Sequence, residues 1–194
     1  RHHRVRFGGR LHDSDREQDR EQHVPAPFGV AVGGAVVCHP SSIAAARGAA
    51  EVVGVDIDAD VIEIAKGNAR LNDVRPRFVQ ADIFPWLRDA ANAGERYDVV
   101  VLDPAKMTRD RAQVIPALKK YLDMNKAALG VVKPGGLFAT FSCTGLVSEE
   151  QFLDMLRRAA FYAGRTVQVL KVSGAGPDHP WLAQAPESRY LKAV

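Results

Sequence analysis

The ten residues 97–106, YDVVVLDPAK, decide the fold. Residues 99–102 (VVVL) are continuously apolar, the pattern of a strand buried on both faces in a parallel sheet. Asp103 follows at once, and Pro104, which has no N–H for a ladder hydrogen bond, ends the strand. In open α/β sheets such a carboxylate faces the crevice where ligands bind. The alternative is that Asp103 and Pro104 only start a turn.

Strand-like and helix-like segments alternate on both sides of this stretch. Strands are expected at 28–37, 51–55, 77–80, 137–141, 166–172 and 189–194. Helices are expected at 42–48, 59–71, 84–93, 109–129 and 149–162, with a break or kink at Pro116 in the fourth. Expected helix caps are Ser41 or Ser42, Asp58 and Ser148. The alternation predicts an α/β fold, a doubly wound and mostly parallel sheet with helices on both faces.

The chain divides into a polar arm and one domain. Residues 1–27 hold four of the six histidines and the repeat DREQ-DREQ, with few apolar side chains. We expect this arm to be disordered, because it buries too little apolar surface to offset chain entropy. An RNA-binding arm is the alternative, although its charges alternate in sign and it offers no aromatic platform. Residues 28–194 are long enough for a single α/β domain.

Composition narrows the class of partner. The net charge of +3 and the pI near 9.0 permit an anionic partner such as RNA without requiring one. No apolar run reaches the roughly 20 residues that span a bilayer, so no membrane partner is expected. Cys38 and Cys143 form no CxxC pair, and Cys38 with His39 lacks further ligands, so neither a disulfide scaffold nor a metal site is expected. A reducing cytoplasm is the simplest location.

Three expected strands end in an acid: Asp56 after EVVGV, Asp82 after FVQA and Asp103 after VVVL. Parallel strands bring these carboxylates to one edge of the sheet, over the ligand crevice. At the second strand, Asp56 is placed to accept two hydrogen bonds from a ribose diol, and Asp82 to accept one from the exocyclic amine of a purine. Both roles suit adenosine. For Asp56 and Asp82 the alternative is a helix N-cap, since a helix follows each strand.

Seven motifs occur together in a fixed order: GVDID at 54–58, QADIF at 80–84, YDVVVLDPAK at 97–106, KPGG at 133–136, FSCTG at 141–145, PDHP at 177–180 and YLKAV at 190–194. In these motifs the chain, from about residue 44 to 194, resembles bacterial S-adenosylmethionine-dependent methyltransferases of the large-subunit rRNA cytosine-C5 type. Members of that family usually carry an N-terminal RNA-binding PUA domain, which this sequence does not contain.

The resemblance implies S-adenosylmethionine as cofactor and RNA, large-subunit rRNA in particular, as partner. It also implies a seven-stranded Rossmann-like sheet whose last strand, around Tyr190, is antiparallel. Asp56 would hold the donor's ribose, Asp82 its adenine amine, and Asp103 would face both the donor and the target base. Pro104 and Lys106 would contact the substrate. The motif containing His179 also matches a family loop, in which a loop-ordering role is expected.

Cys143 is the expected nucleophile. C5 of cytosine is a poor nucleophile until a thiolate adds to C6 and makes C5 enamine-like, and cysteine supplies that thiolate readily. Asp103 would contact the N3/N4 edge of the base and stabilise charge during addition. The alternative for Cys143 is a buried apolar cysteine; for Lys106 it is an ordinary exposed lysine.

Two stretches depart from the family pattern. Ala105 stands where Asp-Pro-Pro-Lys is common, and residues 36–42 (VVCHPSS) lack the acid and the glycine turn expected to hold the donor's methionine part. We therefore keep a second hypothesis, a non-catalytic or impaired methyltransferase-fold remnant with residual RNA binding. A further hypothesis is that part of residues 8–41 is translated out of frame, which sequencing the coding DNA tests.

Overall fold

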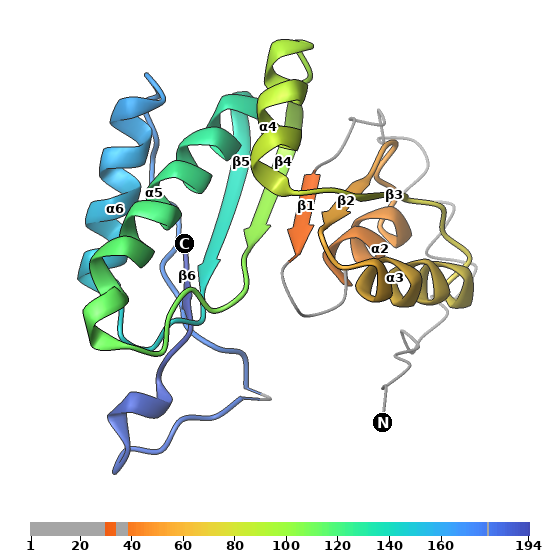
Figure 1. Ribbon diagram of the computed structural model, residues 1–194. Helices are drawn as coiled ribbons and strands as arrows, with labels where there is room; N and C mark the ends of the chain where they lie inside the picture. The colour runs from red at the N-terminus through yellow and green to blue at the C-terminus, as the bar shows by residue number, and fades with distance from the viewer. Residues whose placement is uncertain (1–29, 34–38, 178) are drawn as a thin grey trace.

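A mostly parallel sheet organises the computed structural model, which describes residues 30–33, 39–177 and 179–194 (Figure 1). Within these residues six strands follow the order β3-β2-β1-β4-β5-β6. The strands are β1 (Val30–Gly33), β2 (Val53–Asp56), β3 (Arg77–Gln80), β4 (Tyr97–Asp103), β5 (Val132–Ser142) and β6 (Lys192–Ala193). The helices are α2 (His39–Ala46), α3 (Ala59–Leu71), α4 (Ile83–Asn92), α5 (Val114–Val131) and α6 (Glu149–Tyr162), with short 3₁₀ turns η2 (Arg111–Gln113) and η3 (Pro186–Ser188). The expected arm at 1–27 lies outside the described residues.

The sheet is doubly wound, as expected. β1 pairs in parallel with β2 and β4, β2 with β3, and β4 with β5. The chain thus runs outward from β1 to β3 and then returns to β4 on the other side of β1. This places a topological switch point between β1 and β4, where open α/β sheets bind ligands. Two groups of helices, α4 with α5 and α6, and α2 with α3, cover opposite faces of the sheet (Figure 1).

Two apolar clusters hold these layers together. The larger one lies between the sheet and helices α4 and α5, and includes Val53, Val55, Leu87, Val100, Leu102 and Val131, all fully buried. A smaller one joins α5 to α6 through Tyr121, Val147, Phe152, Met155 and Ala159. In it the rings of Tyr121 and Phe152 meet edge to face with centroids 5.6 Å apart. Val100 and Leu102 of β4 are thus part of the larger core, whereas Val99 and Val101 on the other face are only half-buried, so the run expected to be buried on both faces is fully buried on one.

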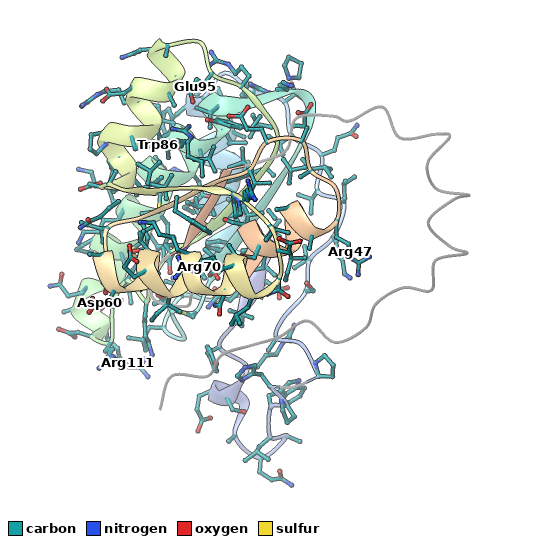
Figure 2. The ribbon with its side chains drawn as sticks, turned by 90° about the vertical axis from the view of Figure 1, so that its right-hand side faces the viewer. Arg47, Asp60, Arg70, Trp86, Glu95 and Arg111 are labelled. Carbon is teal, nitrogen blue, oxygen red and sulfur yellow. The ribbon has the colours of Figure 1, made fainter. Side chains whose placement is uncertain are left out.

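Local signals set the ends of several helices. Helix α3 has the expected bounds, and its N-cap Asp58 accepts hydrogen bonds from the backbone N–H groups of Asp60 and Val61. Asp60 in the first turn and Arg70 in the last complement the helix dipole, and Figure 2 shows both side chains on α3. Ser148 opens α6 with a complete capping box.

Helix α2 begins earlier than expected. It starts at His39, so Ser41 and Ser42 lie inside the helix instead of capping it. Pro40 suits a first helical turn because the N–H it lacks would have no partner in the helix. Both serines are buried. A Cβ on Gly54 would lie 2.8 Å from Ser41 Oγ, so this glycine permits the close approach of α2 to β2.

Helix α5 also differs from the expectation. The 3₁₀ turn η2 precedes it and the α-helix starts at Val114, so Pro116 lies in the first turn and no kink at Pro116 is needed. The expected break is therefore displaced to the junction between η2 and α5.

Strand β5 takes up residues 133–136, the KPGG motif, whose proline and glycines are typical of a turn. Val132 pairs with Tyr97 and Leu137 with Val99, so the four residues between them bulge opposite Asp98 alone. Gly135 has φ +76°, and a Cβ on Gly136 would lie 2.8 Å from the carbonyl oxygen of Asp98. Turn chemistry is thus present, but within a bulged strand.

The expected strand at 166–172 is wrong, because this segment has no regular secondary structure. Directly after this segment, Ser173 forms an isolated antiparallel bridge with Ala193. Among the described residues, 166–171 take part in no strand pairing. The expected strand at 189–194 shortens to β6, which is antiparallel to β5 as expected. Among the described residues the sheet therefore has six strands instead of seven.

None of the helices in the described part of the chain has the length and apolar character needed to cross a membrane.

Candidate active site

The carboxyl ends of the parallel strands bring the predicted acids to one edge of the sheet. Asp56 is the last residue of β2 and Asp103 the last of β4, where it pairs with Gly33 of β1. Since β1 lies between them, their backbones are about two strand spacings, or ~10 Å, apart. Asp82 follows β3, and Cys143 follows β5. The four residues thus line the edge that contains the switch point.

Asp56 is 4% exposed, and only one of its oxygens has a partner among the described residues. Its Oδ1 accepts a hydrogen bond from the N–H of Asp58 at 2.9 Å, whereas Oδ2 is buried without a partner. Burial, followed by the nearby Asp58 carboxylate, raises the pKa of Asp56. The cap of α3 is Asp58, so the N-cap alternative for Asp56 is excluded. A buried, unpartnered carboxylate oxygen fits a ligand hydroxyl pair.

Asp82 is the N-cap of α4. Its Oδ1 accepts a hydrogen bond from the N–H of Phe84 at 2.9 Å, and the side chain is exposed. The capping alternative is therefore observed. A carboxylate has two oxygens, so capping with Oδ1 leaves Oδ2 available as an acceptor.

Asp103 and its neighbours form the loop after β4. Asp103 is partly buried, and burial raises the pKa of its carboxyl group. Pro104 is buried and ends β4, as expected, while Ala105 and Lys106 are exposed. Lys106 is thus exposed, as its alternative interpretation predicted. Its ammonium group nevertheless lowers the pKa of Cys143, which follows the neighbouring strand β5.

Cys143 is a free, partly buried thiol beside Asp103. Burial, then the charge of Asp103, raises the pKa of Cys143, while the ammonium groups of Lys106 and Lys192 lower it. The fold therefore brings Asp103, Lys106 and Cys143 into electrostatic contact across two strands. In the free protein the thiol keeps its proton at neutral pH, so activation requires a change at one of these neighbours.

A buried hydroxyl network fixes the two loops that carry Asp103 and Cys143, and the sequence patterns did not indicate it. The hydroxyl of Tyr121, on α5, lies 2.9 Å from Thr144 Oγ1 and accepts a hydrogen bond from Ser142 Oγ at 3.0 Å. Thr144 Oγ1 also accepts from the N–H of Met107, at 3.0 Å. All three hydroxyl-bearing residues are buried. The network therefore locks residue 107, after Asp103, to residue 144, after Cys143.

Lys192 is a second residue that the sequence patterns did not indicate. It is 4% exposed, and its Nζ donates hydrogen bonds to the carbonyl oxygens of Thr144 at 2.7 Å and Tyr190 at 2.8 Å. Burial lowers the pKa of Lys192 to about 8. The YLKAV motif contained this lysine, but nothing local distinguishes a buried lysine from an exposed one.

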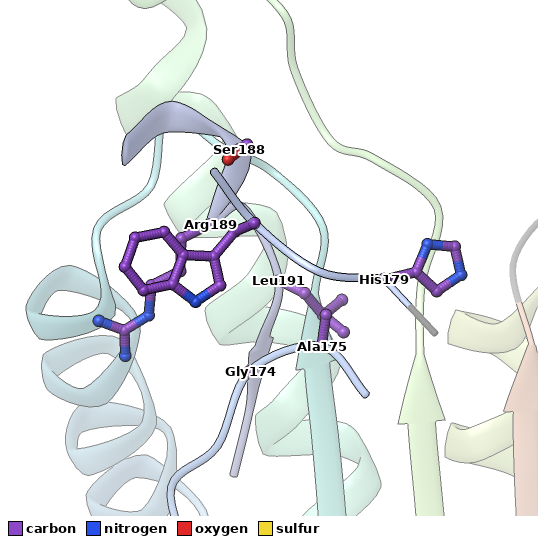
Figure 3. A pocket seen from close by; sticks show the side chains of 7 residues that line it. Gly174, Ala175, His179, Ser188, Arg189 and Leu191 are labelled. Atoms are coloured by element: carbon purple, nitrogen blue, oxygen red, sulfur yellow. The ribbon is translucent and has the colours of Figure 1, made fainter. Parts of the chain in front are cut away.

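A small pocket lies in the loop beside this group. Figure 3 shows its lining side chains, which come from Gly174, Ala175, His179, Trp181, Ser188, Arg189 and Leu191. Its volume is about 260 Å³, just below the roughly 300–1,000 Å³ of pockets for whole small-molecule ligands. The pocket residue Leu191 follows Tyr190, which adjoins the site. A Cβ on Gly145, two residues after Cys143, would lie 3.4 Å from Cβ of Tyr190. A role for His179 in shaping a pocket is compatible with this lining.

The remaining expectations concern groups at the margins of the site. Residues 36–38 of the donor turn expected at 36–42, Cys38 among them, lie outside the described residues, and residues 39–42 form the start of helix α2 instead of a glycine turn. Within the described ranges, no three His, Cys, Asp or Glu side chains are grouped as metal ligands.

Comparisons with known proteins point to one family. Residues 39–186 match the model of a methyltransferase domain. The ribosomal RNA large subunit methyltransferase I of Tolumonas auensis is 40% identical over 150 residues, 76% of this chain and 38% of that protein. The protein of the same name from Aeromonas hydrophila is 39% identical over the same shares. This chain thus spans about two fifths of the length of these curated relatives.

The fold is also found among solved structures. A putative methyltransferase complexed with SAH superposes with a TM-score of 0.74 at 20% identity, over 92% of this chain and 48% of that one. This likeness confirms the predicted Rossmann-like fold.

Proposed function

Because this chain belongs to the methyltransferase domain family, we propose that it transfers a methyl group from S-adenosylmethionine to C5 of a cytosine in RNA, through a covalent adduct with Cys143. The observation that carries the proposal is the position of Asp103 and Cys143 at the carboxyl ends of the neighbouring strands β4 and β5, whose following residues are joined by the hydrogen bond from the N–H of Met107 to Thr144 Oγ1. A thiol beside a carboxyl group is the pair that this chemistry needs.

Asp56 supports the donor site. Its buried, unpartnered Oδ2 at the end of β2 suits one hydroxyl of a ribose diol, and Oδ1 is positioned beside it. Ile57, next in sequence, is 68% exposed and offers an apolar surface at the same edge. Asp82, through its second oxygen, would accept from the adenine amine, and Asp103 would lie between the donor and the target base.

The chemistry assigns separate tasks to Cys143 and Asp103. The Asp103 carboxylate takes the proton of the thiol, and the Sγ–C6 bond forms as Asp103 passes that proton to N3 of the cytosine. The raised pKa of Asp103 favours its protonated form and so suits this relay. When bound, S-adenosylmethionine supplies the methyl group that C5 takes up. A base then removes the C5 proton, and the electron pair of the broken C5–H bond forms the C5–C6 double bond and expels Sγ from C6 as a thiolate. The proton on N3 returns through Asp103 to that thiolate, which restores the neutral base and the Cys143 thiol.

RNA as substrate is supported by the surface beside Cys143. The residues that line the pocket in the C-terminal loop include Trp181, Arg189 and His179, with Arg189 and His179 on opposite sides of it (Figure 3). Aromatic rings and guanidinium planes stack unpaired bases. Lys106 and Pro104 would contact the target nucleotide. Large-subunit rRNA is the substrate in the names of the curated relatives, and we propose the same class here.

Trapping the adduct tests the proposal. Transcripts of large-subunit rRNA segments in which 5-fluorocytidine replaces cytidine keep fluorine at C5, so elimination fails and the Sγ–C6 bond persists. We expect a denaturant-stable protein–RNA adduct that requires S-adenosylmethionine and disappears in Cys143→Ala. Nucleoside analysis of unmodified RNA should give 5-methylcytidine. An adduct or a 5-methylcytidine yield that persists in Cys143→Ala would refute the nucleophile.

The second candidate, a non-catalytic remnant with residual RNA binding, is favoured by one observation, the absence of glycine from residues 36–42. Calorimetric titration with S-adenosylmethionine separates the two. No binding at millimolar donor would favour the remnant for this chain, whereas saturable binding that Asp56→Ala weakens would favour the enzyme.

A further inference from the structure

Lys192 places an ammonium group inside the protein directly beside the candidate nucleophile. The Lys192 backbone pairs with Ser142 of β5, and its Nζ donates to the carbonyl of Thr144, on either side of Cys143. A buried charge is costly unless it is paired or strongly hydrogen-bonded. Here the two hydrogen-bond acceptors found among the described residues are neutral carbonyls. If Lys192 only held the turn in place, a neutral N–H donor could make the same hydrogen bonds at a lower free-energy cost of burial.

The charges around Lys192 come from four elements. Cys143, after β5, and Glu149, at the start of α6, favour the charged form of Lys192, whereas Lys106 opposes it. Glu149 is also engaged by Arg189 at 3.3 Å in an exposed pair. Asp103, the last residue of β4, opposes the thiolate of Cys143, and Lys106 supports it. Tyr121 of α5 meets the same turn through Thr144.

We propose that Lys192 is a positioning residue for Cys143, which holds the Cys143–Thr144 turn through the Thr144 carbonyl and stabilises the negative charge that forms on Sγ. The proposal rests on the nucleophilic role of Cys143 proposed above. An ammonium group has three N–H donors, of which the two carbonyls use two. In this arrangement Lys192 offsets the repulsion between the thiolate and Asp103.

The test measures the Cys143 thiol itself. A Cys38→Ser background leaves Cys143 as the single cysteine of the 194-residue chain, and iodoacetamide alkylation at a series of pH values gives its apparent pKa. Lys192→Gln keeps an N–H donor without the charge, Lys192→Met removes both, and Lys192→Arg keeps the charge. We expect the thiol pKa to rise in the Gln and Met variants, with alkylation at pH 7.5 slowed by a factor of about ten per pKa unit, and the Arg variant to restore it.

Lys133→Met is the matched control. Lys133 lies at the amino end of β5, the strand whose other end leads to Cys143, and it pairs with Asp98 at 2.9 Å. Its replacement therefore removes a positive charge from β5 at the end far from Cys143. An unchanged thiol pKa in a folded Lys192→Gln or Lys192→Met variant, verified by circular dichroism, would overturn the proposal.

The Arg variant keeps the proposal open to refutation if both neutral variants fail to fold. Lys192 loses its charge near its pKa of about 8, whereas arginine stays charged. Between pH 8.5 and 9.5 the Lys192→Arg variant should therefore be alkylated faster than the parent, and equal rates would refute the proposal. Alkylation needs neither RNA nor donor, so this result does not depend on whether the chain methylates RNA, which 5-methylcytidine analysis decides separately.

Discussion

The hydroxyl oxygen of Tyr121 lies 2.9 Å from Oγ1 of Thr144, and this buried contact ties helix α5 to the turn that follows Cys143. Thr144 Oγ1 in turn accepts a hydrogen bond from the N–H of Met107, on the loop that follows Asp103. One tyrosine on a core helix thereby fixes the relative positions of the two loops that carry the proposed chemistry.

Replacing Tyr121 with phenylalanine should therefore lower both stability and activity. The variant keeps the ring that packs on Phe152 but removes the acceptor of the Ser142 hydroxyl and the contact with Thr144, whose Oγ1 keeps only the N–H of Met107. An unsatisfied buried polar group costs about 1–3 kcal/mol. Urea unfolding should show a loss of that size, and single-turnover methyl transfer should slow. Tyr162→Phe is the matched control, because Tyr162 is 53% exposed on α6; an equal loss there would contradict the explanation.

Local patterns were sufficient for the elements whose ends depend on their own residues. The bounds of α3 follow from its apolar spacing and from Asp58, whose side chain caps the helix within three residues. The valines of β4 and the Asp-Pro that follows them predicted both a strand, which is fully buried on one face, and the position of Asp103 at the edge of the sheet. These features need no knowledge of distant partners.

Features that depend on distant residues were missed. The segment 166–172 has strand-like composition, but a strand forms only against a partner, and among the described residues the pairing beside this segment is limited to the bridge between Ser173 and Ala193. The burial of Lys192 likewise results from the antiparallel pairing of β6 with β5, which no pattern within YLKAV encodes. Asp82 shows a different limit of local patterns. The residues around it fit a helix cap and a contact with adenine equally well, so the sequence alone could not choose between the two roles.

Asp56→Asn should weaken donor binding without destabilising the free protein. The amide oxygen can still accept from the N–H of Asp58, but the acceptor at Oδ2 becomes a donor. Calorimetry should show S-adenosylmethionine binding reduced by about 10- to 100-fold, the loss of one or two charge-assisted hydrogen bonds.

Stability should respond to Asp56→Asn in the opposite direction. The pKa of Asp56 is higher in the folded state than in the unfolded chain, so as pH rises the unfolded chain loses this proton first. The free energy of unfolding therefore decreases as pH rises from the unfolded-state pKa to the folded-state pKa. Above it, the parent carries a buried charge that the variant lacks, and the melting temperature of the variant at pH 7 should equal or exceed that of the parent. Asp58→Asn, which keeps a good N-cap, is the control for donor binding. A comparable loss of affinity in both variants would remove Asp56 from the ribose role.

Asp103→Asn should separate thiol reactivity from catalysis. The Asp103 charge raises the pKa of Cys143, so its removal should lower that pKa and speed alkylation by iodoacetamide at pH 7.5. Methyl transfer should nevertheless fall by a factor of about 100 or more, because the amide cannot relay the proton to N3 of the base. Asp110→Asn, at an exposed cap of η2, should change neither rate. Slower alkylation in Asp103→Asn would contradict the electrostatic assignment.

Trp181 should report RNA binding through its fluorescence. The sequence has two tryptophans, and Trp181 is 52% exposed in the pocket beside Arg189, whereas Trp86 packs against Tyr97 with ring centroids 6.4 Å apart. In Trp86→Phe, the remaining indole should be quenched as single-stranded RNA binds, because a base stacks on it. Trp181→Ala should raise KM for RNA about 5- to 150-fold, since stacking contributes about 1–3 kcal/mol per base. In Trp181→Phe, the fluorescence of Trp86 should not change. Saturable RNA binding by anisotropy without quenching in Trp86→Phe would show that the bound strand passes elsewhere on the protein.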